Sequence, residues 1–249
     1  MTVRISIITV SCNSKKEIVP TIASVLAQDC TGIRLEYRII DGASTDGTAD
    51  VARSYCQKMK EKGILYDVVS EPDGGIYDAM NKGIRLAGGE VIGFINSGDW
   101  YEPGALQTVL KTFRMQQCDL MVGSVRIYRR SGHSFIKKAR QRRFQTSRDW
   151  NHPAMFVKSG LYKKYLFANL GIHDDYGFYL KMRTLPVKIV TVEQVLADFT
   201  MGGASNQKGI FIMCRRIYDR YQYCYRANGY SRWYLIECII TEAAKWLLG

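Results

Sequence analysis

Several acidic residues of this chain directly follow short apolar runs, each of which the sequence predicts to be a strand. Asp41 follows a run at residues 35–40, Asp73 one at 64–69, and Asp99 one at 91–95. The carboxyl ends of parallel strands form the edge where open α/β sheets bind ligands. Carboxylates at that edge suit a hydrated divalent cation and a diphosphate. We therefore expect an enzyme that acts on a nucleotide-activated substrate.

Each of these carboxylates also has a simpler interpretation. Asp41 could accept hydrogen bonds from a nucleobase or ribose, or only from its own turn. Asp73 lies in EPDGG, where the glycines would let a ligand approach the backbone or would simply complete a turn. Asp78 and Asn81 share one face of the next predicted helix, a face that water alone could cover.

Asp99 is the most specific candidate. It follows the apolar run VIGFI and a tight polar turn that contains Asn96 and Gly98. One carboxylate, diphosphate oxygens and water form an ordinary shell for Mg²⁺ or Mn²⁺. A metal there would neutralise a leaving diphosphate.

A second acidic cluster, His173-Asp174-Asp175-Tyr176, begins a predicted helix. One of its carboxylates could be a general base that deprotonates an acceptor hydroxyl, or the cluster could only cap the helix. His152 could line the same pocket or be structural. The turn at 202–205 is glycine-rich and could fold over a diphosphate.

The elements that must position these residues alternate regularly in the first half of the chain. We expect strands at 3–10, 35–40, 64–69 and 91–95, and helices at 15–27, from Ser44 or Thr45 to about 62, and at 77–86. This alternation predicts parallel strands joined by crossover helices. Beyond Asp99 we expect helices at 103–115 and 174–185 and strands at 119–128 and 187–192, with a short apolar stretch at 155–157. Residues 1–100 would form a nucleotide-binding half, and residues 101–205 a more irregular half that shapes the pocket of a second substrate.

The tail at residues 206–249 is helical by pattern and rich in Tyr, Arg and Trp. Glu237, Thr241 and Lys245 form one polar stripe on an otherwise apolar helix. Such a helix could close the core, pair with another chain, or lie in a membrane interface. The arginines that flank it favour the membrane more than usual.

The composition further limits the kinds of protein and binding partner that fit this sequence. The net charge is +12, and residues 126–148 carry nine Lys or Arg and no Asp or Glu. Such a charge run is typical of a solvated loop or of a surface that faces a membrane or a polyanion. The seven scattered cysteines form no CxxC pair and predict reduced core thiols in the cytosol rather than disulfides or zinc. The N-terminus does not resemble a signal peptide, and no apolar run is long enough to span a membrane.

In order and spacing, six blocks of the sequence resemble family 2 glycosyltransferases of the GT-A fold. The blocks are SIITVSCN, IIDGASTDGT, SEPDGGIYDAMNKGI, FINSGDW, DDYGFYLKM and DFTMGGAS. The likeness is greatest to bacterial exopolysaccharide enzymes of the colanic-acid type. It implies a Rossmann-like α/β domain with a central, mainly parallel sheet flanked by helices, followed by the helical tail.

The resemblance also implies roles for individual residues. Asp175 matches the catalytic base, and Asp99 matches the acid that holds Mn²⁺ or Mg²⁺. The donor side would comprise Ser11, Asn13, Asp41, Asp73, Asp78, Asn96 and Asp99. The acceptor side would comprise His152, Asp174 and Tyr176.

The sequence departs from the family pattern at two positions. Gly42 and Gly98 stand where many members have a further acid, a change that recurs in the exopolysaccharide relatives. It leaves the nucleobase and ribose contacts open. The QxxRW motif of processive enzymes is absent, which favours transfer of a single sugar.

The resulting hypothesis is an inverting, metal-dependent glycosyltransferase. It would move a sugar from a nucleotide-diphosphate donor to a glycan linked to polyprenyl diphosphate, at the cytoplasmic face of the cell membrane. The alternatives are a non-catalytic scaffold of the same family, a sugar nucleotidyltransferase and a nucleic-acid-binding protein. No recognised motif supports nucleic acid as a partner, and the N-terminus lacks a nucleotidyltransferase's glycine-rich phosphate loop.

Overall fold

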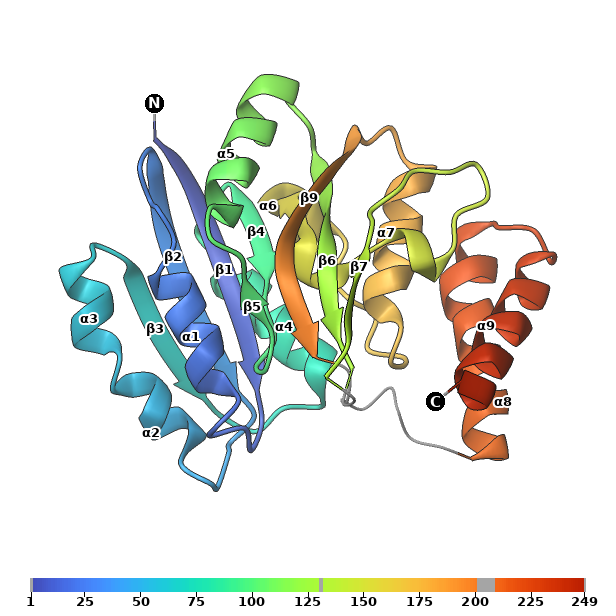
Figure 1. Cartoon of the computed structure of the whole chain (residues 1–249), viewed down its shortest axis with the longest axis horizontal. Helices are drawn as coiled ribbons and strands as arrows, with labels where there is room; N and C mark the ends of the chain where they lie inside the picture. Colours follow the sequence, from blue (N-terminus) through green and yellow to red (C-terminus); the bar gives the residue numbers. More distant parts are fainter. Residues whose placement is uncertain (1, 130–131, 201–208, 249) are drawn as a thin grey trace.

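The protein folds around one mixed sheet with helices on both faces (Figure 1). The structure, a computed structural model, describes residues 2–129, 132–200 and 209–248, with side chains up to residue 244. The strand order is β3-β2-β1-β4-β8-β6-β9-β5, and β7 pairs with β6. The predicted turn at 202–205 and the 205/206 boundary lie outside the described residues.

The first half is the parallel α/β unit that the sequence predicted. β1 (Val3–Ser11), β2 (Ile33–Asp41), β3 (Leu65–Ser70) and β4 (Val91–Phe94) are parallel neighbours. They are joined by α1 (Ile18–Leu26), by α2 (Thr48–Arg53) with α3 (Cys56–Glu61), and by α4 (Ile76–Leu86).

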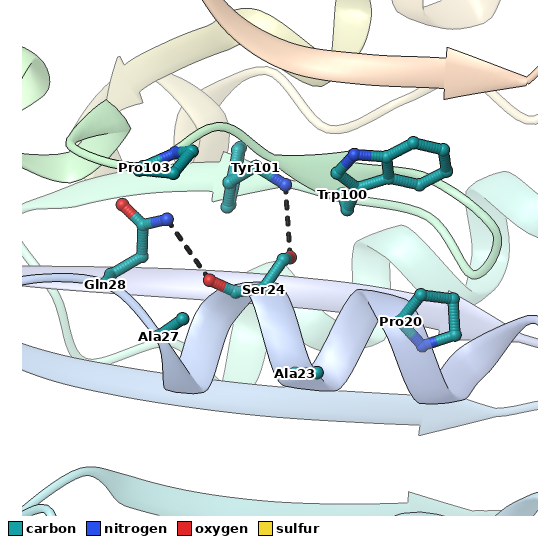
Figure 2. A pocket seen from close by; sticks show the side chains of 8 residues that line it. All are labelled: Pro20, Ala23, Ser24, Ala27, Gln28, Trp100, Tyr101 and Pro103. Carbon is teal, nitrogen blue, oxygen red and sulfur yellow. Dashed lines mark hydrogen bonds between the residues drawn. The ribbon is translucent and has the colours of Figure 1, made fainter.

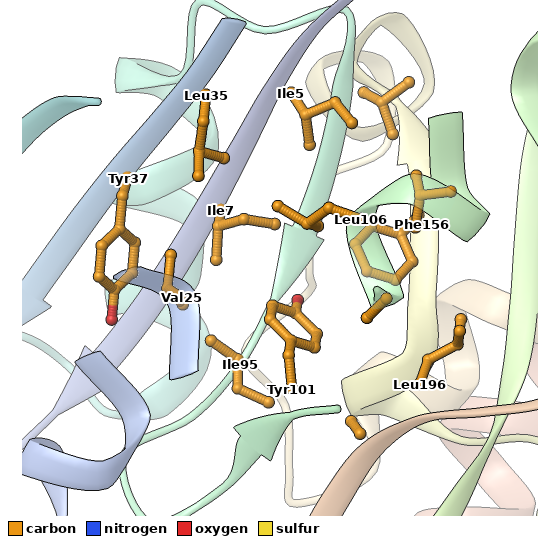
Figure 3. Packing of buried hydrophobic residues seen from close by; sticks show 14 of the residues in the cluster. Ile5, Ile7, Val25, Leu35, Tyr37, Ile95, Tyr101, Leu106, Phe156 and Leu196 are labelled. Carbon is orange, nitrogen blue, oxygen red and sulfur yellow. The ribbon is translucent and has the colours of Figure 1, made fainter. Parts of the chain in front are cut away.

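Burial on both faces explains the continuous apolar run of β1. Ile5 and Ile7 pack on one face with α1 and α5 (Ala105–Gln116), as Figure 3 shows. Ile8 and Val10 pack on the other face in a second cluster, against α4 and α7 (Asp174–Thr184). Each fully buried side chain of this kind contributes about 2 kcal/mol to folding.

The second half of the sheet mixes strand directions. β8 (Met155–Lys158) is antiparallel to β4 and to β6 (Leu120–Tyr128), and β9 (Ile189–Thr200) is parallel to β6. The short strands β5 (Trp100–Tyr101) and β7 (Ser134–Lys137) were not predicted from the sequence. The last large strand was predicted to end at residue 192 but continues to Thr200, which brings its end to the edge where Asp99 lies.

Two helix predictions in the first half were wrong in detail. The single helix predicted up to residue 62 is two short helices with a break at residues 54–55. Neither Ser44 nor Thr45 caps it, because the Ser44 hydroxyl donates to Asp41, and the side chain of Asp46 accepts from the Thr48 N–H (3.0 Å). α1 begins at Ile18 rather than at residue 15.

The tail packs on α7 rather than standing apart. It comprises α8 (Ile210–Asp219), a π-helical turn (Arg220–Tyr225), a 3₁₀ turn (Arg226–Asn228) and α9 (Tyr234–Leu248). Cys224, Tyr225, Tyr234 and Cys238 join the second core cluster. The remaining short elements are α6 (Ser159–Lys164) and two 3₁₀ turns, Ser147–Asp149 and His152–Ala154.

All seven cysteines are unpaired, but the prediction that they are core residues holds only for Cys118, Cys224 and Cys238, because the other four are exposed or half-buried. Across the described part of the chain, no helix combines the length and apolarity needed to cross a membrane.

Candidate functional site

The predicted site residues gather at the carboxyl edge of β1, β2 and β4 and at the start of α7, around α4. Tyr77 of α4 reaches Asp175 of α7 with its hydroxyl, at 3.0 Å. The side-chain amide of Asn81 on α4 donates to the Phe167 carbonyl at 2.9 Å and accepts from the Phe167 N–H at 3.0 Å. The two halves of the sequence therefore meet at α4.

Asp41 is fully buried, and both of its carboxylate oxygens are engaged. It accepts from the Ser11 hydroxyl at 3.0 Å, from the Ser44 N–H and hydroxyl at 2.9 and 2.5 Å, and from the Ser70 hydroxyl at 2.7 Å. Burial alone would raise its pKa, but these hydrogen bonds outweigh burial and lower it. The ionised carboxylate of Asp41 thus holds the turn after β2 in place.

Ser11 and Asn13 belong to the same turn. Asn13 has a left-handed backbone with φ of 46°, and its side-chain oxygen accepts from the Thr45 N–H at 2.9 Å. Its own N–H donates to the Ser44 hydroxyl at 2.7 Å. These bonds clamp the loop after β1 to the loop after β2 and give this edge a fixed shape.

Gly42 leaves room for Asp73. A Cβ atom at position 42 would lie 2.6 Å from a carboxylate oxygen of Asp73. Asp73 accepts from the Gly75 N–H at 2.9 Å, and Asp78 accepts from the Gly74 N–H at 3.0 Å. The acid missing at residue 42 is thus replaced in space by Asp73.

The turn that carries Asp99 is anchored by α1. The Thr21 hydroxyl donates to the Asp99 carbonyl at 2.7 Å and accepts from the Gly98 N–H at 3.0 Å. The Ser24 hydroxyl accepts from the Tyr101 N–H at 3.1 Å, as Figure 2 shows. The groove drawn there between α1 and β5 is mainly apolar, and none of the candidate carboxylates lines it.

The Asp99 carboxyl is 5 % exposed, and burial raises its pKa to about 8 although the Thr200 N–H counteracts this. Two oxygens of the same turn, Asn96 Oδ1 and Ser97 Oγ, are buried and have no hydrogen-bond partner among the residues that the structure describes. A buried carboxylate beside unsatisfied oxygens suits a hard cation. No group of three His, Cys, Asp or Glu side chains within the described ranges could hold a metal, so substrate oxygens and water would complete the shell.

Asp175 sits between two aromatic side chains. Its Oδ1 accepts the Tyr77 hydroxyl, and its Oδ2 lies 3.4 Å from His152 Nδ1. His152 is buried against Phe94, with ring centroids 5.5 Å apart. Burial lowers the pKa of His152, and the Asp175 charge only partly opposes this. A neutral His152 leaves the carboxylate without a full counter-charge.

The other two predicted acceptor residues play different parts. Asp174 accepts from the Leu170 N–H at 2.7 Å and orders the loop before α7, while burial raises its pKa. The Tyr176 side chain does not join the cluster: it is buried, and its hydroxyl lies 3.1 Å from that of Tyr225 in the tail. Helical geometry explains this, because adjacent residues of α7 point in different directions.

Tyr77 and Thr21 are the site residues that the sequence analysis missed. Tyr77 stands directly before Asp78 in the block SEPDGGIYDAMNKGI, and this adjacency was the available signal. Thr21 lies inside a predicted helix, and nothing in its local sequence indicates the contact with Asp99.

Comparison with known proteins agrees with this geometry. The family model described as "Glycosyl transferase family 2" matches residues 6–171. The chain belongs to this family, as the sequence predicted.

Curated relatives match parts of the chain. An uncharacterized glycosyltransferase of Mycobacterium tuberculosis is 43% identical over 38% of this chain and 34% of its own length. A PGL/p-HBAD biosynthesis glycosyltransferase of Mycobacterium bovis is 28% identical over 74% of this chain and 72% of its own. The putative teichuronic acid biosynthesis glycosyltransferase TuaG of Bacillus subtilis is 32% identical over 46% and 43%. The match thus spans about a third of the first relative's length.

Solved structures confirm the GT-A fold. Staphylococcus aureus TarS 1–349 in complex with UDP-GlcNAc superposes with a TM-score of 0.66 at 17% identity, covering 97% of this chain and 72% of TarS 1–349. A mannosyltransferase from Pyrobaculum calidifontis in complex with GDP-Man and Mn²⁺ also gives 0.66, at 16% identity, covering 98% and 74%.

Proposed function

We propose that the protein is an inverting glycosyltransferase that moves one sugar from a nucleotide-diphosphate donor to a hydroxyl of a glycan acceptor. The observation that carries this is Asp175, a partly exposed carboxylate that Tyr77 orients beside a buried His152. It lies at the sheet edge that also holds Asp73 and Asp99. A base on one side and a diphosphate site on the other are what displacement at an anomeric carbon requires.

Asp175 acts as the base. The acceptor hydroxyl gives its proton to Asp175 as its oxygen bonds to the anomeric carbon, and the bond from that carbon to the diphosphate oxygen breaks. The nucleoside diphosphate leaves with the electron pair. Because attack and departure occur on opposite faces of the sugar, the anomeric configuration inverts. Tyr77 keeps one carboxylate oxygen engaged, which leaves the other for the proton.

The nucleotide-sugar donor is proposed to bind at the loops after β1 and β2, which Ser11, Asn13 and Asp41 hold together. Asp73 and Asp78, in and after the turn that precedes α4, would border the same site. The solved neighbours described with UDP-GlcNAc and GDP-Man support a nucleotide sugar as donor. Asp41 would act by shaping the turn, since protein donors already occupy its oxygens.

Asp99 is proposed to hold Mn²⁺ or Mg²⁺, with Asn96 beside it. Such a cation would neutralise the leaving diphosphate. The neighbour described with Mn²⁺ supports this choice. Asp99 has to lose its proton to bind a cation, so binding couples to pH.

The acceptor is proposed to be a surface glycan linked to polyprenyl diphosphate. The relatives named for PGL/p-HBAD and teichuronic acid biosynthesis support a role in cell-surface glycan or glycolipid assembly. The colanic-acid-type likeness stays a prediction.

The test of the base is Asp175→Asn, with nucleotide release from a panel of nucleotide sugars as the assay. General-base catalysis contributes about 10²–10⁴-fold, so we expect a loss of that size while the melting temperature and donor binding are kept. The matched control is Asp67→Asn, an exposed acid on β3 away from the cluster. Full activity in Asp175→Asn would refute its assignment as base and favour another acid of the site. No transfer by the wild type with any donor would favour the non-catalytic scaffold.

A further inference from the structure

The helix α9, whose orientation the sequence left open, turns part of its polar side inward. Its polar side chains Glu237, Thr241 and Glu242 point inward, where Thr241 and Glu242 are buried. Glu237 accepts from the Tyr225 and Thr241 hydroxyls, at 3.2 and 3.0 Å. Tyr234 and Cys238 are buried with these polar side chains, whereas Ile236, Ile239 and Ile240 are exposed to solvent.

A buried ion pair explains this orientation. Arg220 is 1 % exposed and donates to Glu242 at 2.6 Å, with His173 at 3.3 Å. A buried guanidinium requires a carboxylate partner. Turning α9 to bury its isoleucines would take Glu242 away from Arg220, so the helix keeps the pair and leaves the isoleucines outside.

We call the exposed side chains the α9 apolar stripe, made of Trp233, Ile236, Ile239 and Ile240. They recur three or four residues apart, which places them on one helix face. Clustered large apolar side chains on a surface mark an interaction site.

The surroundings of the stripe are basic. A shallow groove runs between Ile236 and Ile240 on one side and Phe144 and Arg148 on the other. Phe144 also stacks on Tyr234, with centroids 4.3 Å apart. The basic segment at residues 137–148 therefore adjoins the stripe. The exposed cations of this region are Lys138, Arg140, Arg142, Arg143, Arg148, Arg226 and Arg232.

Exposed negative charge is sparse around the α9 apolar stripe. The three carboxylates of the tail, Asp219, Glu237 and Glu242, are buried or half-buried. Residues 126–148 contain none. Exposed Glu193 lies 3.7 Å from Lys138 at the edge of this surface, but exposed cations outnumber it. A row of apolar side chains bordered by a surplus of cations complements a bilayer with anionic headgroups.

We propose that the α9 apolar stripe and the basic segment together dock on an anionic lipid surface, with the isoleucines and Trp233 in the acyl boundary and the arginines on headgroup phosphates. The α9 end of the molecule, remote from β3 in Figure 1, would lie on the membrane. The proposal does not depend on glycosyl transfer, because lipid binding is measured without substrate.

The test is co-sedimentation of the full chain with phosphatidylcholine vesicles that contain or lack phosphatidylglycerol. We expect binding to the anionic vesicles only. Ile236→Asn/Ile240→Asn should weaken binding at least about tenfold. The matched control is Leu65→Asn, since Leu65 on β3 is 57 % exposed, as Ile240 is.

The contribution of the basic segment is tested with Arg143→Glu/Arg148→Glu, which should also weaken binding to anionic vesicles at least about tenfold. Its control, Lys60→Glu/Lys111→Glu, changes net charge equally at exposed positions of α3 and α5. A melting curve for each variant confirms folding.

Three results would overturn the proposal: no binding of the wild type to anionic vesicles, equal binding by the stripe variant and its control, or a dimer that the stripe variant breaks without any vesicle binding. The last would assign the stripe to a second copy of the chain.

Discussion

At the residue scale, the site depends on how its carboxylates are partnered. Asp41 has donors on both oxygens and stays ionised, whereas Asp99 is buried with little compensation, which raises its pKa to about 8. Asp175 has one oxygen held by the Tyr77 hydroxyl and the other beside His152 Nδ1. The same side-chain chemistry is therefore a structural anchor at Asp41 and, in the proposed function, a cation ligand at Asp99 and a base at Asp175.

The contact from Tyr77 to Asp175 gives a first residue-scale prediction. Tyr77→Phe removes one hydrogen bond, worth about 0.5–1.5 kcal/mol, and keeps the ring that packs on Phe167. We expect kcat to fall up to about tenfold, with the donor KM unchanged. Steady-state kinetics checks this. A change confined to KM would show that Tyr77 contributes to binding rather than to orientation of the base.

The raised pKa of Asp99 gives a second residue-scale prediction, on how stability depends on pH. In the folded apo protein the carboxyl keeps its proton up to about pH 8, while in the unfolded chain it loses it near pH 4. Folding therefore binds a proton between these values, and the contribution of Asp99 to stability falls as pH rises from about 4 to about 8. Asp99→Asn lacks this dependence.

Urea unfolding of both proteins without metal measures the difference. The wild type should lose on the order of a few kcal/mol relative to Asp99→Asn between pH 4 and pH 8. A difference that stays constant over this range would show that Asp99 is less buried than the structure indicates.

At the element scale, α4 and α7 bring the two halves of the sequence together, and the tail supports α7 from behind. The carbonyl of His173, one residue before Asp174, lies 3.2 Å from Cys224 Sγ, and its ring lies against Arg220. The tail helices therefore help to set the position of α7, which carries the proposed base.

The Arg220–Glu242 pair tests this support. Glu242→Ala leaves a buried guanidinium without its carboxylate, which costs about 3–5 kcal/mol. The double variant Arg220→Met/Glu242→Leu should recover most of that loss. Denaturant unfolding measures both. If Glu242→Ala lowers the free energy of unfolding by less than about 1 kcal/mol, as expected for a surface ion pair, the pair is not buried as described.

The elements also show what sequence patterns can predict. Long apolar runs fixed by burial on both faces, such as β1 and β2, were predicted closely. β5 and β7 were missed because two- and four-residue strands form only when a partner strand is present. The break between α2 and α3 was missed because no proline or internal glycine marks it.

The same contrast holds for the site. Asp99 and Asp175 stand in blocks with recognisable spacing, so the sequence could propose roles for them, which stay predictions. The inward turn of Tyr176 and the contact of Thr21 with Asp99 arise from packing between distant segments, on which local pattern carries no information. The orientation of α9 was left open for the same reason, since Arg220 decides it from another element.

At the scale of the whole molecule, the sheet edge would bind the donor while the basic, apolar α9 end would bind lipid. An enzyme that modifies a lipid-linked glycan needs both surfaces. The net charge of +12 is concentrated away from the carboxylate edge, in the basic segment and the tail. Charge distribution thus separates the two proposed binding surfaces.

The most direct test of the central claim is a thermal-shift screen of UDP-, GDP- and dTDP-sugars with Mn²⁺ or Mg²⁺. A ligand that binds only the folded protein raises its melting temperature, with about 2.7 kcal/mol of stabilisation at a hundredfold excess over Kd. We expect at least one nucleotide sugar to do so only with metal, to lose the effect in Asp99→Asn, and to keep it in Asp175→Asn. No shift with any donor, or a shift that Asp99→Asn leaves unchanged, would contradict a metal-dependent glycosyltransferase.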